Sequence, residues 1–204
     1  QFSSDRNEAE EVCDRIKERK AETSCSYRDM AILYRTNSQS RAFEDALRFR
    51  NIPYRLFGGL SFYSRKEIKD VLAYFRLVVN NNDNDAFLRI INYPARGIGQ
   101  TSLDRLKIAA DSMNCSLFDA ASSDCLSQFG IKSSTASTLS DFCAFIRACS
   151  VELYNEDALT LGEKIIKRSR LKETISEEDK AESKDRLENV EELISGLQSF
   201  VSLE

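Results

Sequence analysis

Helix-breaking residues are scarce in this chain, which has two prolines and seven glycines among its 204 residues. Proline removes a backbone donor and clashes inside a helix, and glycine destabilises a helix interior, so long stretches without either residue favour helices. No proline occurs beyond Gly99. We therefore expect the second part of the chain to be helical, with short loops at residues 122–124, 130–134 and 176–180.

The first part of the sequence alternates helical and strand patterns. Residues 5–20 have the periodicity of a charged amphipathic helix, and the apolar run at residues 30–34 predicts a strand. A helix capped by Asn37 or Ser38 then extends to about Arg50. After Pro53, a second predicted strand at residues 54–57 ends in the turn Gly58-Gly59. Helix, strand, helix, strand is typical of a piece of a parallel α/β sheet.

Two further helices are predicted at residues 65–80 and 86–93, separated by an Asn/Asp cluster that suits a turn and a helix cap. We place a domain boundary at this cluster. The predicted fold class is α/β plus all-α, with a partial parallel α/β domain over residues 1–82 and a mainly helical domain over residues 83–204.

The last predicted helix has an apolar stripe that could be an ordinary packing face or the seam of a coiled coil. The stripe covers only two heptads, which favours the packing face. Its residues are Leu187, Val190, Ile194, Leu197 and Val201.

Composition limits the possible functions. The hydrophobic content of 42% is enough for a core, no run reaches the roughly 20 apolar residues of a membrane span, and no signal peptide is recognisable, so we expect a soluble cytoplasmic protein. Residues 1–100 carry 17 basic against 14 acidic side chains, and residues 101–204 carry 12 against 19. Any contact with nucleic acid must therefore come from a local basic patch or from backbone amides.

The six cysteines show no Cys-x-x-Cys pair, and the chain has no histidine. A cysteine-based metal site is therefore not expected. Cysteines at helical apolar positions are more often small core residues than disulfide partners in an intracellular protein.

Tyr34 and Arg35 directly follow the first predicted strand. In open α/β sheets ligands lie beyond the carboxyl ends of the strands, where an aromatic ring and a guanidinium suit a purine and a phosphate. The alternative is a half-buried aromatic beside a solvated cation.

Several blocks between about Ala31 and Leu106 occur in a distinctive order. They are Tyr-Arg-Thr-Asn-Ser-Gln-Ser-Arg from Tyr34, Gly-Gly-Leu-Ser-Phe-Tyr-Ser-Arg-Lys-Glu-Ile-Lys-Asp from Gly58, and Tyr-Pro-Ala-Arg-Gly-Ile-Gly from Tyr93. This order and spacing closely resembles the UvrD/PcrA/Rep family of superfamily 1 DNA helicases.

The resemblance implies a piece of an ATP-dependent helicase that moves 3′ to 5′ on single-stranded DNA and also meets duplex DNA. The piece would comprise part of the second RecA-like motor domain and the helical accessory domain inserted into it. The sequence has no Gly-x-x-x-x-Gly-Lys-Ser/Thr loop and no metal-binding Asp-Glu pair after a strand, so ATP with Mg²⁺ is expected only in the intact parent. A helicase subunit of a helicase-nuclease complex and a non-catalytic helical adaptor for DNA or protein remain alternatives.

The resemblance also implies roles for single residues. Tyr34 corresponds to a tyrosine that stacks on adenine, and Arg35 to an arginine finger that reaches the γ-phosphate. The block that meets single-stranded DNA contributes Ser61, Phe62, Arg65 and Lys66. Ser61 stands where the family usually has Arg or Lys, which weakens the expected phosphate contact, and Phe62 could equally stack on a base or pack in the core.

A second DNA contact is expected at the Gly97-Ile98-Gly99 turn, which opens a helix. Its glycines would allow close approach, and helix-start amides would bind a duplex phosphate, with Arg96 beside them and Thr101 or Ser102 as cap. Without the surrounding blocks, such a turn is more often only a helix cap.

Overall fold

The computed structural model describes residues 4–35, 39–57, 59–178 and 182–202. The chain divides into two compact units, Gln1–Ile68 and Lys69–Glu204, and each has its own internal packing. The domain boundary predicted between residues 82 and 83 stays a prediction.

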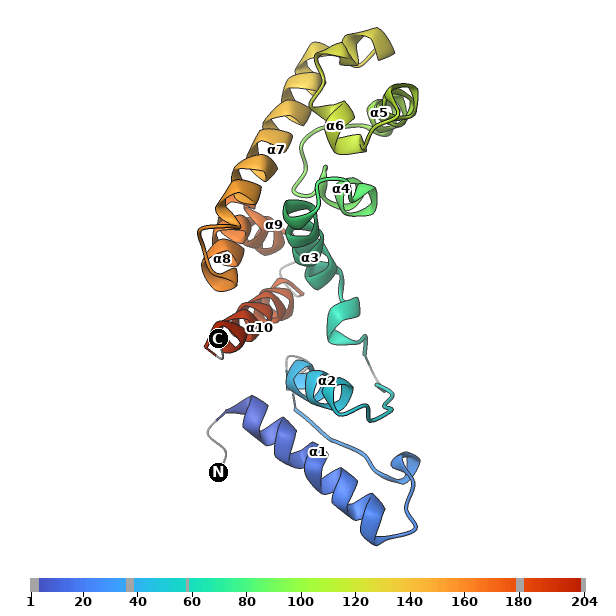
Figure 1. Ribbon diagram of the computed structural model, residues 1–204, viewed down its shortest axis with the longest axis vertical. Coiled ribbons are helices and arrows are strands. Elements are labelled where there is room, and N and C mark those ends of the chain that lie inside the picture. The colour runs from blue at the N-terminus through green and yellow to red at the C-terminus, as the bar shows by residue number, and fades with distance from the viewer. Residues whose placement is uncertain (1–3, 36–38, 58, 179–181, 203–204) are drawn as a thin grey trace. The chain divides into compact units, whose positions relative to one another are not determined.

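The first unit contains two α-helices that pack together, α1 (Asp5–Glu22) and α2 (Ser40–Phe49) (Figure 1). Ser4 caps α1 by accepting the amide of Asn7 at 3.2 Å. Acidic residues in the first turn of α1 and basic residues in the last match the helix dipole. The core between the helices consists of Ala9, Cys13, Ala42, Ala46, Leu47 and Ile52.

The two predicted strands are not formed. Residues 30–34 and 54–57 have irregular backbone, and the described part of the chain contains helices and turns but no strand. A strand exists only through ladder hydrogen bonds to a neighbour, and neither segment has one among the described residues. Ile32 and Tyr54 instead pack against the core of the first unit, whereas Leu33 and Phe57 are largely exposed.

The α/β half of the predicted fold class is therefore not evident, and the helical half is confirmed. The predicted caps Asn37 and Ser38, and Gly58 of the predicted turn, lie outside the described residues. The described residues of the first unit also include two short 3-10 helices, η1 (Tyr27–Asp29) and η3 (Phe62–Ser64).

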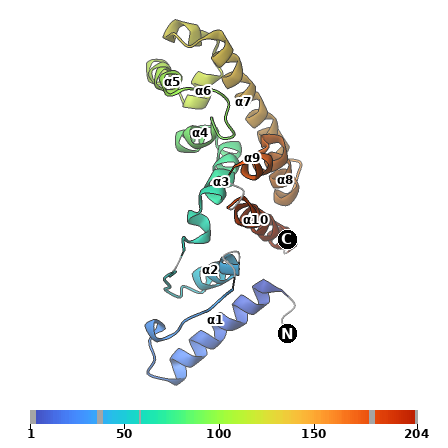
Figure 2. The ribbon, with the colours of Figure 1, turned by 180° about the vertical axis from the view of Figure 1, so that it is seen from behind.

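The described residues of the second unit form helices joined by turns and short loops, as the scarcity of proline and glycine predicted (Figures 1 and 2). It begins within α3 (Lys66–Val79), and Asp83 in the Asn/Asp cluster caps the next helix by accepting the amide of Ala86 at 2.9 Å. The remaining elements are α4 (Asn84–Ile90), α5 (Gln100–Met113), α6 (Leu117–Ala121), η4 (Asp124–Phe129), α7 (Ser133–Glu152), α8 (Ala158–Ser169), α9 (Leu171–Glu177) and α10 (Ser183–Val201).

An aromatic cluster forms part of the core of the second unit. The ring of Phe87 meets those of Phe118 and Phe142 edge to face, at centroid distances of 6.5 and 5.8 Å. Tyr74, which is fully buried, approaches Phe142 at 6.5 Å. Such edge-to-face pairs add to the free energy of area burial. The cluster links α3, α4, α6 and α7.

The last helix, α10, packs against α8 and α9. Val190 and Ile194 of its apolar stripe are buried there. The stripe is thus a packing face inside the unit.

The six cysteines are free thiols, and Cys13, Cys143 and Cys149 are buried. Burial raises the pKa of these three thiols, which keeps them protonated and unreactive. Within the described ranges, no group of three or more His, Cys, Asp or Glu side chains is placed to hold a metal ion. Among the helices of those ranges, none combines the length and apolar character needed to cross a bilayer.

Candidate functional site

Tyr34 and Arg35 lie just before α2, in the first unit. The half-buried ring of Tyr34 lies nearly parallel to that of Phe43, with 6.4 Å between centroids and 15° between planes. The backbone N–H of Arg35 donates to the Gln39 side chain at 2.9 Å, while the guanidinium side chain is exposed. The aromatic ring is therefore held against α2, and the cation points away from the core of its unit.

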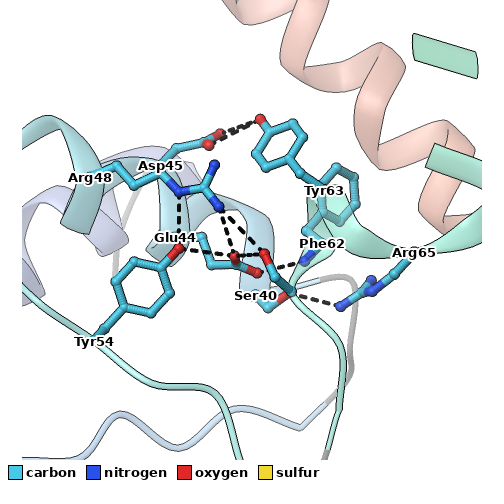
Figure 3. A network of polar contacts seen from close by, with 9 residues as sticks. Ser40, Glu44, Asp45, Arg48, Tyr54, Phe62, Tyr63 and Arg65 are labelled. Carbon is cyan, nitrogen blue, oxygen red and sulfur yellow. Dashed lines mark hydrogen bonds and ion pairs between the residues drawn. The ribbon is translucent and has the colours of Figure 1, made fainter. Parts of the chain in front are cut away.

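The segment at residues 61–66 is fixed to α2 by side-chain hydrogen bonds (Figure 3). The Ser61 hydroxyl donates to the buried carboxylate of Glu44, and the Phe62 backbone N–H donates to the same carboxylate at 2.8 Å. The Tyr63 hydroxyl donates to Asp45 at 3.0 Å. Burial, together with the negative charge of Asp45, raises the pKa of Tyr63 to about 12, so the hydroxyl remains a donor.

Two of the predicted DNA-binding residues in this segment are buried. Phe62 is completely buried, which favours packing over base stacking for its ring. Arg65 is 9% exposed, donates to the Ser40 hydroxyl at 2.9 Å and lies over the Phe62 ring. Lys66, the first residue of α3, has an exposed side chain, and Ser61 is half-buried.

The Gly97-Ile98-Gly99 turn has exposed glycines on either side of a buried anchor. Ile98 is 3% exposed, whereas both glycines are exposed. Gly97 has a φ of +71°, which favours glycine, and a Cβ atom added at Gly97 or Gly99 would meet no heavy atom within 4 Å. The turn therefore leaves space for another molecule to approach the backbone closely.

Gly99 occupies the cap position of α5, and no side chain caps that helix. The prediction that Thr101 or Ser102 provides the cap is wrong, because both lie inside the helix, beyond the position from which a side chain can cap it. The Thr101 side chain is exposed and Ser102 is half-buried. The Ser102 amide donates to the Gly99 carbonyl at 2.9 Å, so the amides of Gln100 and Thr101 are the donors that the start of α5 presents beside the turn.

Arg96 is held in place by the protein itself. Its Nη1 donates to the backbone carbonyls of Ile90, Ile91 and Pro94 at 2.8, 3.0 and 3.1 Å. Its Nη2 donates to the Tyr74 hydroxyl at 2.7 Å, and the guanidinium lies 4.8 Å from the centroid of the Phe142 ring. The structure therefore places Arg96 beneath the turn, where it satisfies carbonyls at the end of α4.

Sequence reasoning missed two side chains that organise these segments. Asn92 accepts the backbone N–H groups of Arg96 at 2.8 Å and Ile98 at 3.3 Å, and so defines the turn from one side. An Asn shortly before a proline is a recognisable turn signal. Glu44 could not be found this way, because an acidic residue in an amphipathic helix is normally assigned to solvent.

Comparison with known proteins gives consistent matches along the chain. The family described as the UvrD-like helicase C-terminal domain matches residues 1–204. Over 191 residues, or 94% of its length, the chain is 36% identical to the ATP-dependent DNA helicase PcrA of Staphylococcus aureus and to that of Staphylococcus epidermidis. The matched region makes up 26% of each relative, so the chain spans about a quarter of their length.

Proposed function

The chain belongs to the family of UvrD-like helicases, and from this premise we propose that it is part of a cytoplasmic ATP-dependent DNA helicase. The intact protein moves 3′ to 5′ along single-stranded DNA and unwinds duplex DNA in repair, recombination or replication. The observation that carries the proposal is the family match along the whole chain.

In this proposal the nucleotide meets the segment before α2. Tyr34 stacks on adenine through the part of its ring that Phe43 does not cover. The exposed Arg35 reaches the γ-phosphate, where a guanidinium stabilises the charge that spreads over the transferring phosphoryl group. Magnesium arrives with ATP as part of the substrate, and the described residues offer it no carboxylate cluster.

Single-stranded DNA meets the segment at residues 61–66. Phe62 and Arg65 shape this segment from inside, because both are buried against α2 and its neighbours. The exposed side chain of Lys66 and the exposed part of Ser61 face the single-stranded DNA. Since the Ser61 hydroxyl already donates to Glu44, its contribution to a phosphate contact is small.

Duplex DNA meets the turn in the second unit. A phosphate approaches the exposed Gly97 and Gly99 and accepts hydrogen bonds from backbone amides at the start of α5. Ile98 anchors the turn in the core, and Arg96 supports it from beneath. Backbone contacts of this kind bind DNA without reading its sequence.

The direct test uses the intact parent protein on duplexes with either a 3′ or a 5′ single-stranded tail. We expect ATP hydrolysis that depends on single-stranded DNA, and unwinding of the 3′-tailed duplex only. Hydrolysis and unwinding that favour the 5′ tail contradict the proposed direction. DNA binding without any hydrolysis points to the non-catalytic adaptor, and nuclease activity in the same complex points to a helicase-nuclease subunit.

A further inference from the structure

Helix α2 contacts both segments to which the proposed function assigns ligands within the first unit. On the nucleotide side, Gln39 precedes the helix and accepts the Arg35 amide, and Phe43 lies against Tyr34. On the DNA side, Ser40, Glu44 and Asp45 accept hydrogen bonds from residues 61–65. This single helix of ten residues, about 15 Å long, therefore touches both segments.

Glu44 is the centre of the contacts on the DNA side. Its side chain is 1% exposed. Oε1 accepts the Phe62 backbone N–H at 2.8 Å, and Oε2 accepts the hydroxyls of Ser61 and of Tyr54, the latter at 3.1 Å (Figure 3). A buried carboxylate is tolerated only when its oxygens are hydrogen-bonded and its charge is balanced.

Arg48 balances that charge and fixes the direction of the hydrogen bonds. Its Nη2 lies 3.5 Å from Oε2 of Glu44, one helical turn away. Its Nε donates to the Tyr54 hydroxyl at 3.0 Å, and its Nη2 donates to the Ser61 hydroxyl at 3.4 Å. Each hydroxyl thus accepts from Arg48 and donates to Glu44. An amide at position 44 would present its own donors to hydroxyls that already point toward it.

We propose that Glu44 is a positioning residue that couples the nucleotide-facing and DNA-facing segments through α2, an inference that rests on the proposed function. When single-stranded DNA displaces residues 61–65, the bonds to Glu44 pass the displacement to α2. The same helix holds Tyr34 and Arg35 through Phe43 and Gln39. DNA and ATP therefore change each other's affinity, and by linkage the factor is the same in both directions.

The test measures this factor in the intact helicase. The Kd for a fluorescent single-stranded oligonucleotide is determined by anisotropy with and without a non-hydrolysable ATP analogue. We expect the two values to differ by about 5- to 150-fold in the wild type, the usual range for coupled sites. Glu44→Gln, which keeps the size of the side chain, should bring the two values within about twofold of each other.

A structural defect alone would not produce this result, because it would shift both Kd values together. The matched control is Glu191→Gln, which alters an exposed carboxylate of α10 that accepts from Lys172 at 2.6 Å. This variant should keep the wild-type ratio. A folded Glu44→Gln protein that also keeps the ratio overturns the inference.

If Glu44→Gln shows no cooperative thermal unfolding, the variant is not folded, and the same measurement is made with Tyr54→Phe instead. This change removes one donor to Glu44 and keeps the ring, so the ratio should fall part of the way toward one. An unchanged ratio in Tyr54→Phe overturns the inference. A wild-type protein that does not bind single-stranded DNA contradicts the proposed function itself, whereas a wild-type ratio that Glu44→Gln preserves overturns the inference alone.

Discussion

The segment at residues 61–66 and the turn at residues 96–99 are both proposed to meet DNA, yet they are constructed in opposite ways. In the segment at residues 61–66, the side chains of Phe62 and Arg65 are buried, and Arg65 donates a hydrogen bond to Ser40 of α2. In the second, the side chains of Arg96 and Ile98 are turned inward so that two glycines lie exposed. The first is positioned by a buried carboxylate, whereas the second offers bare backbone.

This difference teaches that a residue type does not reveal whether it contacts a ligand or supports the residue that does. Arg65 and Arg96 both resemble phosphate-binding cations in the sequence. In the structure each donates to neutral oxygen atoms of its own unit, a hydroxyl for Arg65 and carbonyls for Arg96. Only Arg35 among the predicted arginines has an exposed side chain. Substitutions at ligand-facing and supporting positions should therefore have different effects on activity, stability and DNA binding.

Arg35→Ala in the intact helicase should have the largest effect. An arginine that stabilises the transferring phosphoryl group contributes about 10³- to 10⁵-fold to the rate. We expect DNA-stimulated kcat to fall by a factor in this range while ATP binding stays within about tenfold. Steady-state hydrolysis and nucleotide titration measure the two. Hydrolysis at the wild-type rate would remove Arg35 from the mechanism.

Arg96→Ala should reduce the stability of the fold more than it reduces DNA binding. The change leaves the carbonyls of Ile90 and Ile91 at the end of α4, the Pro94 carbonyl and the Tyr74 hydroxyl without their charged donor. We expect the free energy of unfolding to fall by about 3 kcal/mol, measured by urea denaturation. If instead stability is unchanged and the salt dependence of duplex binding falls by about one unit of slope, Arg96 contacts a phosphate and does not act as a support for the turn.

Tyr34→Ala should raise the KM for ATP more than it lowers kcat. Stacking on the base contributes equally to the ground state and the transition state, and a stacked base is worth about 1–3 kcal/mol. We therefore expect KM to increase by about 5- to 150-fold. Tyr34→Phe, which keeps the ring, serves as the control and should behave like wild type. An unchanged KM in the alanine variant would leave Tyr34 as a packing partner of Phe43.

Gly99→Val should weaken duplex binding without unfolding the protein. The added Cβ meets nothing within 4 Å, so the fold has room, but the branched side chain blocks approach to the helix start. We expect about tenfold lower affinity, or about 1.4 kcal/mol, for a duplex with a 3′ tail. Thr101→Ala changes a side chain at the same helix start and should alter affinity by less than about threefold.

Equal and wild-type-like binding by Gly99→Val and Thr101→Ala would show that the turn only begins α5. A larger loss in Thr101→Ala than in Gly99→Val would assign the contact to side chains. In that case the turn would not differ from the segment at residues 61–66 in the way it meets DNA.

Much of the helical architecture follows from the sequence. Periodicity and caps predict helices over residues 5–20, 65–80 and 86–93, and the structure has α1, α3 and α4 there with small shifts at the ends. Asp83 as a cap follows from the same reasoning. These features depend on interactions between residues close in sequence, which is why sequence patterns reveal them.

The two strands could not be predicted correctly from local pattern. Short apolar runs such as residues 30–34 fit a strand only when a neighbouring strand supplies its hydrogen bonds. In the described residues these runs have irregular backbone, and their side chains Ile32 and Tyr54 pack against the core of the first unit. Leu33 and Phe57 of the same runs are largely exposed, so the apolar pattern indicated neither the secondary structure nor which side chains are covered.

By itself the sequence determined where α1, α3 and α4 lie, that the chain beyond Gly99 is helical, which blocks resemble a helicase family, and that Gly97 and Gly99 form a turn before a helix. Tertiary structure alone decided that Glu44 accepts from Ser61 and Phe62, residues 17 and 18 positions away, and that Arg96 donates to Tyr74, 22 positions away. The physical reason is the range of the interactions. Helix periodicity and capping act within one or two turns, whereas a buried charge must find its partners wherever the folded chain brings them.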